Sequence, residues 1–69
     1  MKLSEKLASA RKQSHMSLGM AARYSEIPKS TLWRYEKGIS RIPADALTVL
    51  AKLYGVDVNG LLYGETHHV

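Results

Sequence analysis

The segment from Lys29 to Gly38, KSTLWRYEKG, holds the side chains of this sequence best suited to bind an anion. It carries cations at Lys29, Arg34 and Lys37, together with a tryptophan and a single acid. Lysine and arginine side chains bind phosphate groups, and arginine also donates two hydrogen bonds to a guanine edge. These groups act on one partner only if they share one side of the helix.

A helical wheel of about 100° per residue separates the segment into two faces. Leu32 and Tyr35 fall on one side, and Glu36 falls on the flank turned toward the body of the protein. The opposite face carries Lys29, Ser30, Trp33, Arg34 and Lys37. The sequence therefore predicts a helix with a buried side and a cationic side. Such a helix fits the major groove of DNA, which admits one helix.

The expected contacts follow from the chemistry of each side chain. Arg34 suits a guanine, Ser30 donates or accepts a hydrogen bond, and Lys29 reaches a guanine or a phosphate. Trp33 has two open interpretations: apolar contact with a thymine methyl group or a sugar, or half-burial against a neighbouring helix. The alternative for the whole face is an ordinary solvated polar surface.

Charge is distributed unevenly along the 69 residues, which suffice for one small folded domain. Residues 1–41 hold nine lysines and arginines against three acids, a net of +6. Residues 42–69 hold one lysine against three acids, a net of −2. This asymmetry suggests a polyanionic partner, either nucleic acid or an anionic membrane surface, but charge that serves solubility alone is an equal alternative on this observation.

The absence of cysteine and of long apolar runs bears on disulfides, metal sites and membrane spans. The chain has no cysteine, so disulfides and thiolate metal sites are excluded. No apolar run approaches the roughly 18 residues that a membrane span needs, and the N-terminus lacks the apolar stretch of a signal peptide. We therefore expect a cytoplasmic protein without a membrane partner.

Helix-starting and helix-ending residues divide the chain into five short helices. Ser17 suits an N-cap, Pro28 and Pro43 suit a first turn, and Gly38 and Gly55 suit helix ends. The expected helices cover about residues 3–14, 18–25, 28–37, 43–54 and 57–62, the last capped by Asp57. Sustained period-2 alternation is missing from the sequence, which predicts an all-α domain.

The second and third of these helices are joined by only about three residues. The small side chain of Ala22 lets the two helices cross closely, while Ile27, Leu32 and Tyr35 fill the angle between them. Two helices that cross steeply on a short turn make a helix-turn-helix.

The runs MSLGMAARYSEIPKSTLWRYEKG and PADALTVLAKLYGVDVNGLL resemble the phage-repressor Cro/CI helix-turn-helix family over about residues 3–63. The residues that carry the resemblance are Arg11, Ser17, Ala22, Leu32, the Tyr35–Gly38 ending, and the Leu50–Val56 run that leads to Leu61 and Leu62. The resemblance implies a compact five-helix domain of the lambda-repressor-like DNA-binding fold. It also implies symmetric dimers on pseudo-palindromic operator DNA, with the third helix in the major groove.

The resemblance assigns roles by position. Base contacts fall to Lys29, Ser30 and Arg34, with Trp33 at an outward position of variable role. Contacts with the DNA backbone fall to Lys37, to Arg41 in the following loop, and to the amide groups at Ser17 and Leu18 that open the second helix. Arg11 and Glu36 match an arginine and a glutamate that members of the family often join in a structural ion pair.

Three residues depart from the family pattern. Leu18 stands where many members carry a glutamine that contacts phosphate, so only its backbone amide remains for that contact. Glu26 replaces the usual glycine of the turn, a position that often needs a positive φ. Ala21 replaces a common leucine, so Met16, Met20 or Tyr24 must fill the space.

The last helix is rich in large apolar residues for its length. We expect it to close the core and also to form a dimer seam, with Leu61 or Leu62 inward and Val58 or Tyr63 toward a partner.

We expect neither an enzyme nor a metal site. His67 and His68 are adjacent and lack a second cluster of ligands, and Ser14, His15 and Ser17 lack the order of a nucleophile, base and orienting group. No cofactor or small-molecule ligand is expected.

The sequence thus predicts a helix-turn-helix DNA-binding domain over residues 1–65 and a C-terminal tail over residues 66–69. The predicted function is a repressor-like transcriptional regulator that binds operator DNA as a homodimer. A second interpretation is a protein-interaction module, an antitoxin or antirepressor with the same fold. The chain is either a short regulator complete in itself or the DNA-binding piece of a longer repressor.

Overall fold

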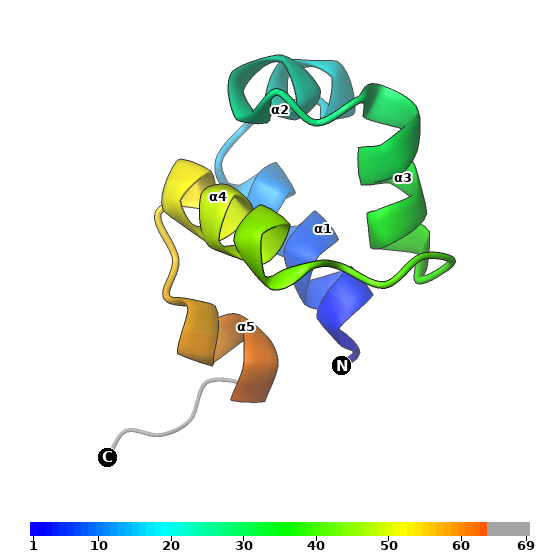
Figure 1. Cartoon of the computed structure of the whole chain (residues 1–69). Helices are drawn as coiled ribbons and strands as arrows, with labels where there is room; N and C mark the ends of the chain where they lie inside the picture. The colour runs from blue at the N-terminus through cyan, green and yellow to red at the C-terminus, as the bar shows by residue number, and fades with distance from the viewer. Residues whose placement is uncertain (64–69) are drawn as a thin grey trace.

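The computed structural model describes residues 1–63, and these form five α-helices with no strand among them (Figure 1). The helices are α1 (Leu3–Gln13), α2 (Leu18–Ser25), α3 (Lys29–Lys37), α4 (Ala44–Tyr54) and α5 (Val58–Tyr63). The prediction of an all-α, five-helix domain is confirmed. None of these helices is long and apolar enough to cross a membrane. The expected tail, with His67 and His68, lies outside the described residues.

The helix ends follow the capping residues of the sequence. The Oγ of Ser17 accepts a hydrogen bond from the backbone N–H of Met20 at 3.1 Å, which makes Ser17 the N-cap of α2. The helices α3 and α4 each begin one residue later than expected, because Pro28 and Pro43 are N-caps rather than residues of the first turn. The Oδ1 of Asp57 accepts from the N–H of Asn59 at 3.3 Å at the start of α5.

The helices α2 and α3 meet at a corner, and α1 and α4 pack on the inner side of this corner (Figure 1). The largest fully buried side chains, Leu7, Leu32 and Leu50, come from α1, α3 and α4. The buried core consists of Leu7, Ala10, Ala21, Ala22, Leu32, Tyr35, Leu47, Leu50, Ala51, Tyr54 and Leu61. Because α3 contributes two of these residues, one side of it is fixed against the body of the domain.

Small residues let α2 approach its neighbours closely. Ala21 is fully buried and Ala22 nearly so. Met16 is partly buried and packs against the core, whereas Met20 and Tyr24 are 43% and 63% exposed. Of the three residues expected to compensate for the small side chain at position 21, only Met16 therefore contributes substantially to the core.

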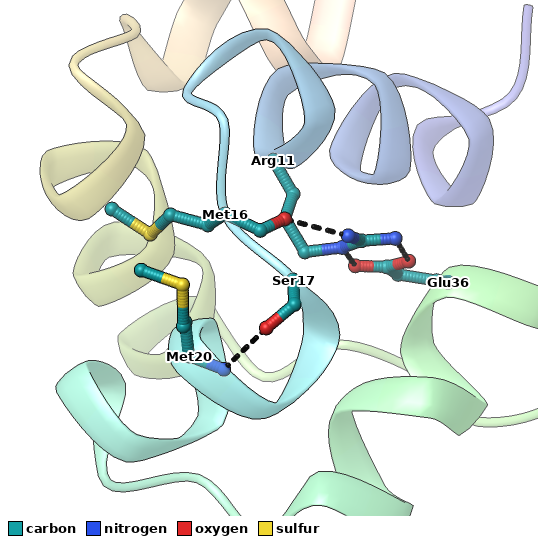
Figure 2. Close-up of polar contacts among 5 residues, drawn as sticks. All are labelled: Arg11, Met16, Ser17, Met20 and Glu36. Atoms are coloured by element: carbon teal, nitrogen blue, oxygen red, sulfur yellow. Dashed lines mark hydrogen bonds and ion pairs between the residues drawn. The ribbon is translucent and has the colours of Figure 1, made fainter.

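A two-point ion pair joins α1 to α3 (Figure 2). The Nε of Arg11 donates to Oε2 of Glu36 at 2.8 Å, and its Nη2 donates to Oε1 at 3.0 Å. The remaining terminal nitrogen donates to the carbonyl oxygen of Met16 at 2.8 Å, in the segment before α2. The hydrogen bond with Glu36 raises the pKa of Arg11 above its ordinary value. Arg11 therefore connects α1, α3 and the entry to α2.

The C-terminal ends of α1 and α4 are also joined. The hydroxyl of Ser14 donates to the carbonyl oxygen of Tyr54 at 3.2 Å. The Tyr54 hydroxyl is buried, and it has no hydrogen-bond partner among residues 1–63. Burial, with a smaller contribution from the negative charge of Glu36, raises the pKa of Tyr54 to about 12. Tyr54 is thus neutral throughout the physiological pH range.

The turn between α2 and α3 places a side-chain residue in a backbone conformation that favours glycine. Glu26 is the C-cap of α2, with φ 63° and ψ 25°. The left-handed region costs a residue with a Cβ about 1–2 kcal/mol, because the Cβ crowds the following carbonyl oxygen. The glutamate in place of the usual turn glycine therefore keeps the turn geometry and carries its strain.

We expect Glu36→Gln to lower the free energy of unfolding by about 3 kcal/mol, because Arg11 then keeps its charge in a nearly buried place without a counter-ion. The two side chains are only 12% and 7% exposed. Urea unfolding followed by circular dichroism measures the change. Glu26→Gln, at an exposed glutamate, is the control and should change stability little.

The double variant Arg11→Met with Glu36→Leu tests the cause of that loss. Since it removes both charges together, it should be more stable than Glu36→Gln. If the double variant were the less stable protein, an unpaired buried charge would not be the reason for the loss.

We expect Glu26→Gly to raise the free energy of unfolding by about 0.5–1 kcal/mol, because glycine adopts positive φ without strain. The reverse experiment is Gly55→Ala at the C-cap of α4. Gly55 has φ 69°, and an added Cβ would meet no atom within 4 Å. Gly55→Ala should therefore destabilise the domain through backbone strain alone. A Glu26→Gly protein less stable than the parent would show that Glu26 makes a compensating contribution.

Candidate nucleic-acid interface

The helix α3 has a buried side and an exposed side. Leu32 and Tyr35 point into the core, and Thr31 and Glu36 lie at the borders, where Glu36 has only 7% of its side chain exposed. The exposed side consists of Lys29, Ser30, Trp33, Arg34 and Lys37. All five residues that the helical wheel assigns to the outer face are therefore exposed on one helix.

Both ends of α3 are fixed by its sequence. Pro28 precedes its first residue, and Gly38 ends it with φ 73°. Beyond this end, the N–H of Ile39 donates to the carbonyl oxygen of Arg34 at 3.0 Å. A Cβ added at Gly38 would lie 3.2 Å from the Oγ of Ser4, so the end of α3 lies close to the start of α1. The loop that follows this fixed end carries the exposed Arg41.

The exposed cations of α3 and the loop after it are available for a partner. Within residues 1–63 the one ion pair is that between Arg11 and Glu36. The cations of α3 and of the loop after it are outside this pair and all exposed: Lys29, Arg34, Lys37 and Arg41. Because Arg11 neutralises the only acid of α3, this surface carries uncompensated positive charge, which attracts polyanions.

The start of α2 lies next to this surface. The first amide groups of a helix have no partner within it and point outward at its positive end, a suitable place for a phosphate. Here these groups include the amide of Leu18, directly after Ser17. The Oγ of Ser17 accepts from the N–H of Met20, so its own hydrogen is left to donate to an anion.

An open apolar depression joins the start of α2 to α3. Its walls are Leu18, Lys29, Ser30 and Trp33, and they are almost entirely apolar. Trp33 is 45% exposed, so it is not sequestered in the core, and Leu18 is half-buried. Of these four residues, Leu18 is the one for which the sequence predicted a role of the backbone amide alone. A leucine at the first position of α2 and a tryptophan on the cationic face were the signals for an apolar site.

The residues considered for catalysis or metal binding have other roles. The hydroxyl of Ser14 donates to the carbonyl oxygen of Tyr54, and that of Ser17 caps α2. His15 is exposed, with φ 60° at the turn after α1. The described part of the chain holds no group of three or more His, Cys, Asp or Glu residues that could hold a metal ion.

The four residues of the expected dimer seam divide into two kinds. Leu61 is buried, and Val58 is partly buried and packs against the core. Leu62 and Tyr63 are exposed, Tyr63 to 78%. The inward residue of the expected pair is therefore Leu61. The outward residue is Tyr63, and Val58 faces the protein.

Comparison with known proteins gives one match. A family model described as a helix-turn-helix domain matches residues 2–61, which include α1 to α4 and most of α5. No curated protein and no solved structure matches the chain. The match agrees with the corner formed by α2 and α3 and with the cationic exposed side of α3, and a helix-turn-helix domain implies DNA binding. The chain belongs to the family of helix-turn-helix domains.

Proposed function

We propose that this protein is a sequence-specific transcriptional regulator of the Cro/CI phage-repressor type. It binds pseudo-palindromic operator DNA as a homodimer and places α3 in the major groove. The observation that carries the proposal is the exposed side of α3, where three cations, a serine and a tryptophan lie on a helix whose other side is buried. Regulation of this kind acts on DNA in the bacterial cytoplasm and involves no catalytic step or cofactor.

The geometry of α3 supports base contacts as well as phosphate contacts. Arg34 lies one turn after Ser30, and Trp33 lies one turn after Lys29, so the four side chains form one continuous strip along the helix. A bidentate arginine distinguishes guanine from the other bases. Lys37 and Arg41, at and beyond the end of α3, are placed for the DNA backbone, as are the amide groups that begin α2.

A homodimer follows from the symmetry of the proposed operator. Two copies related by a two-fold axis place two α3 helices about one turn of DNA apart. The exposed apolar side chains of Leu62 and Tyr63 at the end of α5 support a contact between copies. Burial of these side chains between two subunits removes apolar surface from water.

Selection of bound sequences from random double-stranded DNA tests the proposal directly. The expected result is a pseudo-palindrome with half-sites about 10 base pairs apart, centre to centre. Failure to enrich any sequence would contradict the proposal and favour the alternative of a protein-interaction module, an antitoxin or antirepressor.

Two variants separate base contacts from backbone contacts. We expect Arg34→Ala to cost about 1–3 kcal/mol in binding and to relax the preference at one base position of each half-site. We expect Lys37→Ala to weaken binding to all sequences. It should also reduce the slope of log K against log salt concentration by about one per subunit. Fluorescence anisotropy over a series of salt concentrations measures both quantities.

Lys52→Ala is the matched control, since Lys52 is an exposed cation on α4. It should leave the sequence preference and the salt dependence nearly unchanged. If Arg34→Ala and Lys37→Ala had no effect beyond that of Lys52→Ala, α3 would not be the helix that binds DNA.

The dimer is tested by Tyr63→Glu, which places a charge in the proposed seam without touching the core. We expect sedimentation at micromolar concentration to show a dimer for the parent protein and a monomer for the variant. Tyr63→Glu should also weaken binding to DNA with two half-sites far more than binding to a single half-site. Val49→Glu, at an exposed apolar residue of α4, is the control. A monomeric parent protein, with and without operator DNA, would contradict the seam.

A further inference from the structure

We infer that the apolar depression between α2 and α3 binds the C5-methyl group of a pyrimidine in the major groove, and that Leu18 and Trp33 are specificity-determining residues. The inference rests on the proposed function, because it assumes that α3 enters the groove. It gives Trp33 and Leu18 a defined ligand group, which neither the family match nor the charge of the surface supplies.

The depression lies where the first turn of α2 meets the exposed side of α3. Its walls are Leu18 from the first turn of α2, and Lys29, Ser30 and Trp33 from the first two turns of α3. Lys29 and Trp33 are four residues apart on the same side of the helix, so the ammonium group and the indole flank one patch of surface. A DNA duplex held by the exposed cations of α3 therefore lies over this depression.

The walls of the depression suit an apolar ligand group. Because they are almost entirely apolar, the depression offers little to a phosphate or to the hydrogen-bonding atoms of a base. The side chain of Lys29 lines it with its methylene groups and keeps its charge available for the DNA backbone. Among the groups on the edges of the base pairs in the major groove, the C5-methyl group of thymine is the apolar one. Charge around the rim and apolar walls inside thus match a methylated pyrimidine of a polyanion.

Two natural bases of DNA carry this methyl group. Thymine and 5-methylcytosine both project a methyl group from C5, whereas deoxyuridine and cytosine project only a hydrogen. Removal of one methyl from a well-fitted apolar site costs about 0.8 kcal/mol, which corresponds to about a fourfold change in affinity per half-site. A symmetric dimer that loses both methyl groups should bind about fifteenfold more weakly by the same estimate.

The experiment compares methylated and unmethylated versions of the selected DNA. Each thymine of the half-site is replaced in turn by deoxyuridine, and each cytosine by 5-methylcytosine, symmetrically in both half-sites. Each replacement changes only the C5 substituent and leaves the hydrogen-bonding groups of the base in place. The expected result is one position per half-site where the two methyl groups together strengthen binding about fifteenfold, or about fourfold for each half-site. That position identifies the source as thymine or as 5-methylcytosine.

Variants then connect the methyl effect to the depression. Trp33→Ala and Leu18→Ala should abolish most of the difference between methylated and unmethylated DNA at that position. Met20→Ala is the matched control, because Met20 is a half-exposed apolar residue of α2 that does not line the depression. It should keep the full methyl effect. Circular dichroism checks the fold of each variant, and Leu18→Met is a milder second variant at the half-buried position.

The outcomes distinguish this inference from the proposed function. Enriched DNA without any methyl-dependent position would overturn the inference and leave the proposed function standing. A methyl effect that persists in both Trp33→Ala and Leu18→Ala would also overturn it, because the methyl group would then bind elsewhere. Failure to enrich any DNA would instead contradict the proposed function, on which the inference rests.

Discussion

The ion pair between Arg11 and Glu36 is the interaction on which the arrangement of this surface depends. It spans 25 residues of sequence and joins α1 to α3 through two hydrogen bonds at 2.8 and 3.0 Å. A third bond from the same guanidinium, to the carbonyl oxygen of Met16, fixes the approach to α2. One planar cation therefore positions both helices of the helix-turn-helix. A bidentate arginine suits this role because its fork geometry restricts direction as well as distance.

The pair also has an electrostatic consequence. Glu36 is the only acid of α3, and its pairing with Arg11 removes a negative charge from a helix that otherwise presents cations. The partner of Glu36 comes from α1, so Lys29, Arg34 and Lys37 are not used to neutralise it. The cost of holding both charges nearly out of water is offset by the hydrogen bonds that they make, which is why loss of one partner is expensive.

In the turn between α2 and α3, packing of the helices outweighs backbone strain. Glu26 accepts a left-handed conformation that glycine would adopt without strain. The packing of Leu32, Ala21 and Ala22 on either side of this turn holds the helices in place and so maintains the conformation. By contrast, Gly38 and Gly55 adopt the left-handed conformation without strain at the ends of α3 and α4. Among residues 1–63, the residues with a side chain that adopt this strained conformation are thus Glu26, at the corner between α2 and α3, and His15, in the turn after α1.

Much of this protein was predictable from local sequence. The five helices followed from N-caps, prolines and glycines, since capping and φ restriction act within a few residues. The two faces of α3 followed from helical periodicity alone. The tertiary structure decided what depends on residues distant in the chain. Leu18 and Trp33 lie 15 positions apart, and only the crossing of α2 and α3 brings them to one depression. Likewise only packing determined that Val58 turns inward while Tyr63 faces solvent, because a helix of six residues has too few turns for its pattern to define a single buried side.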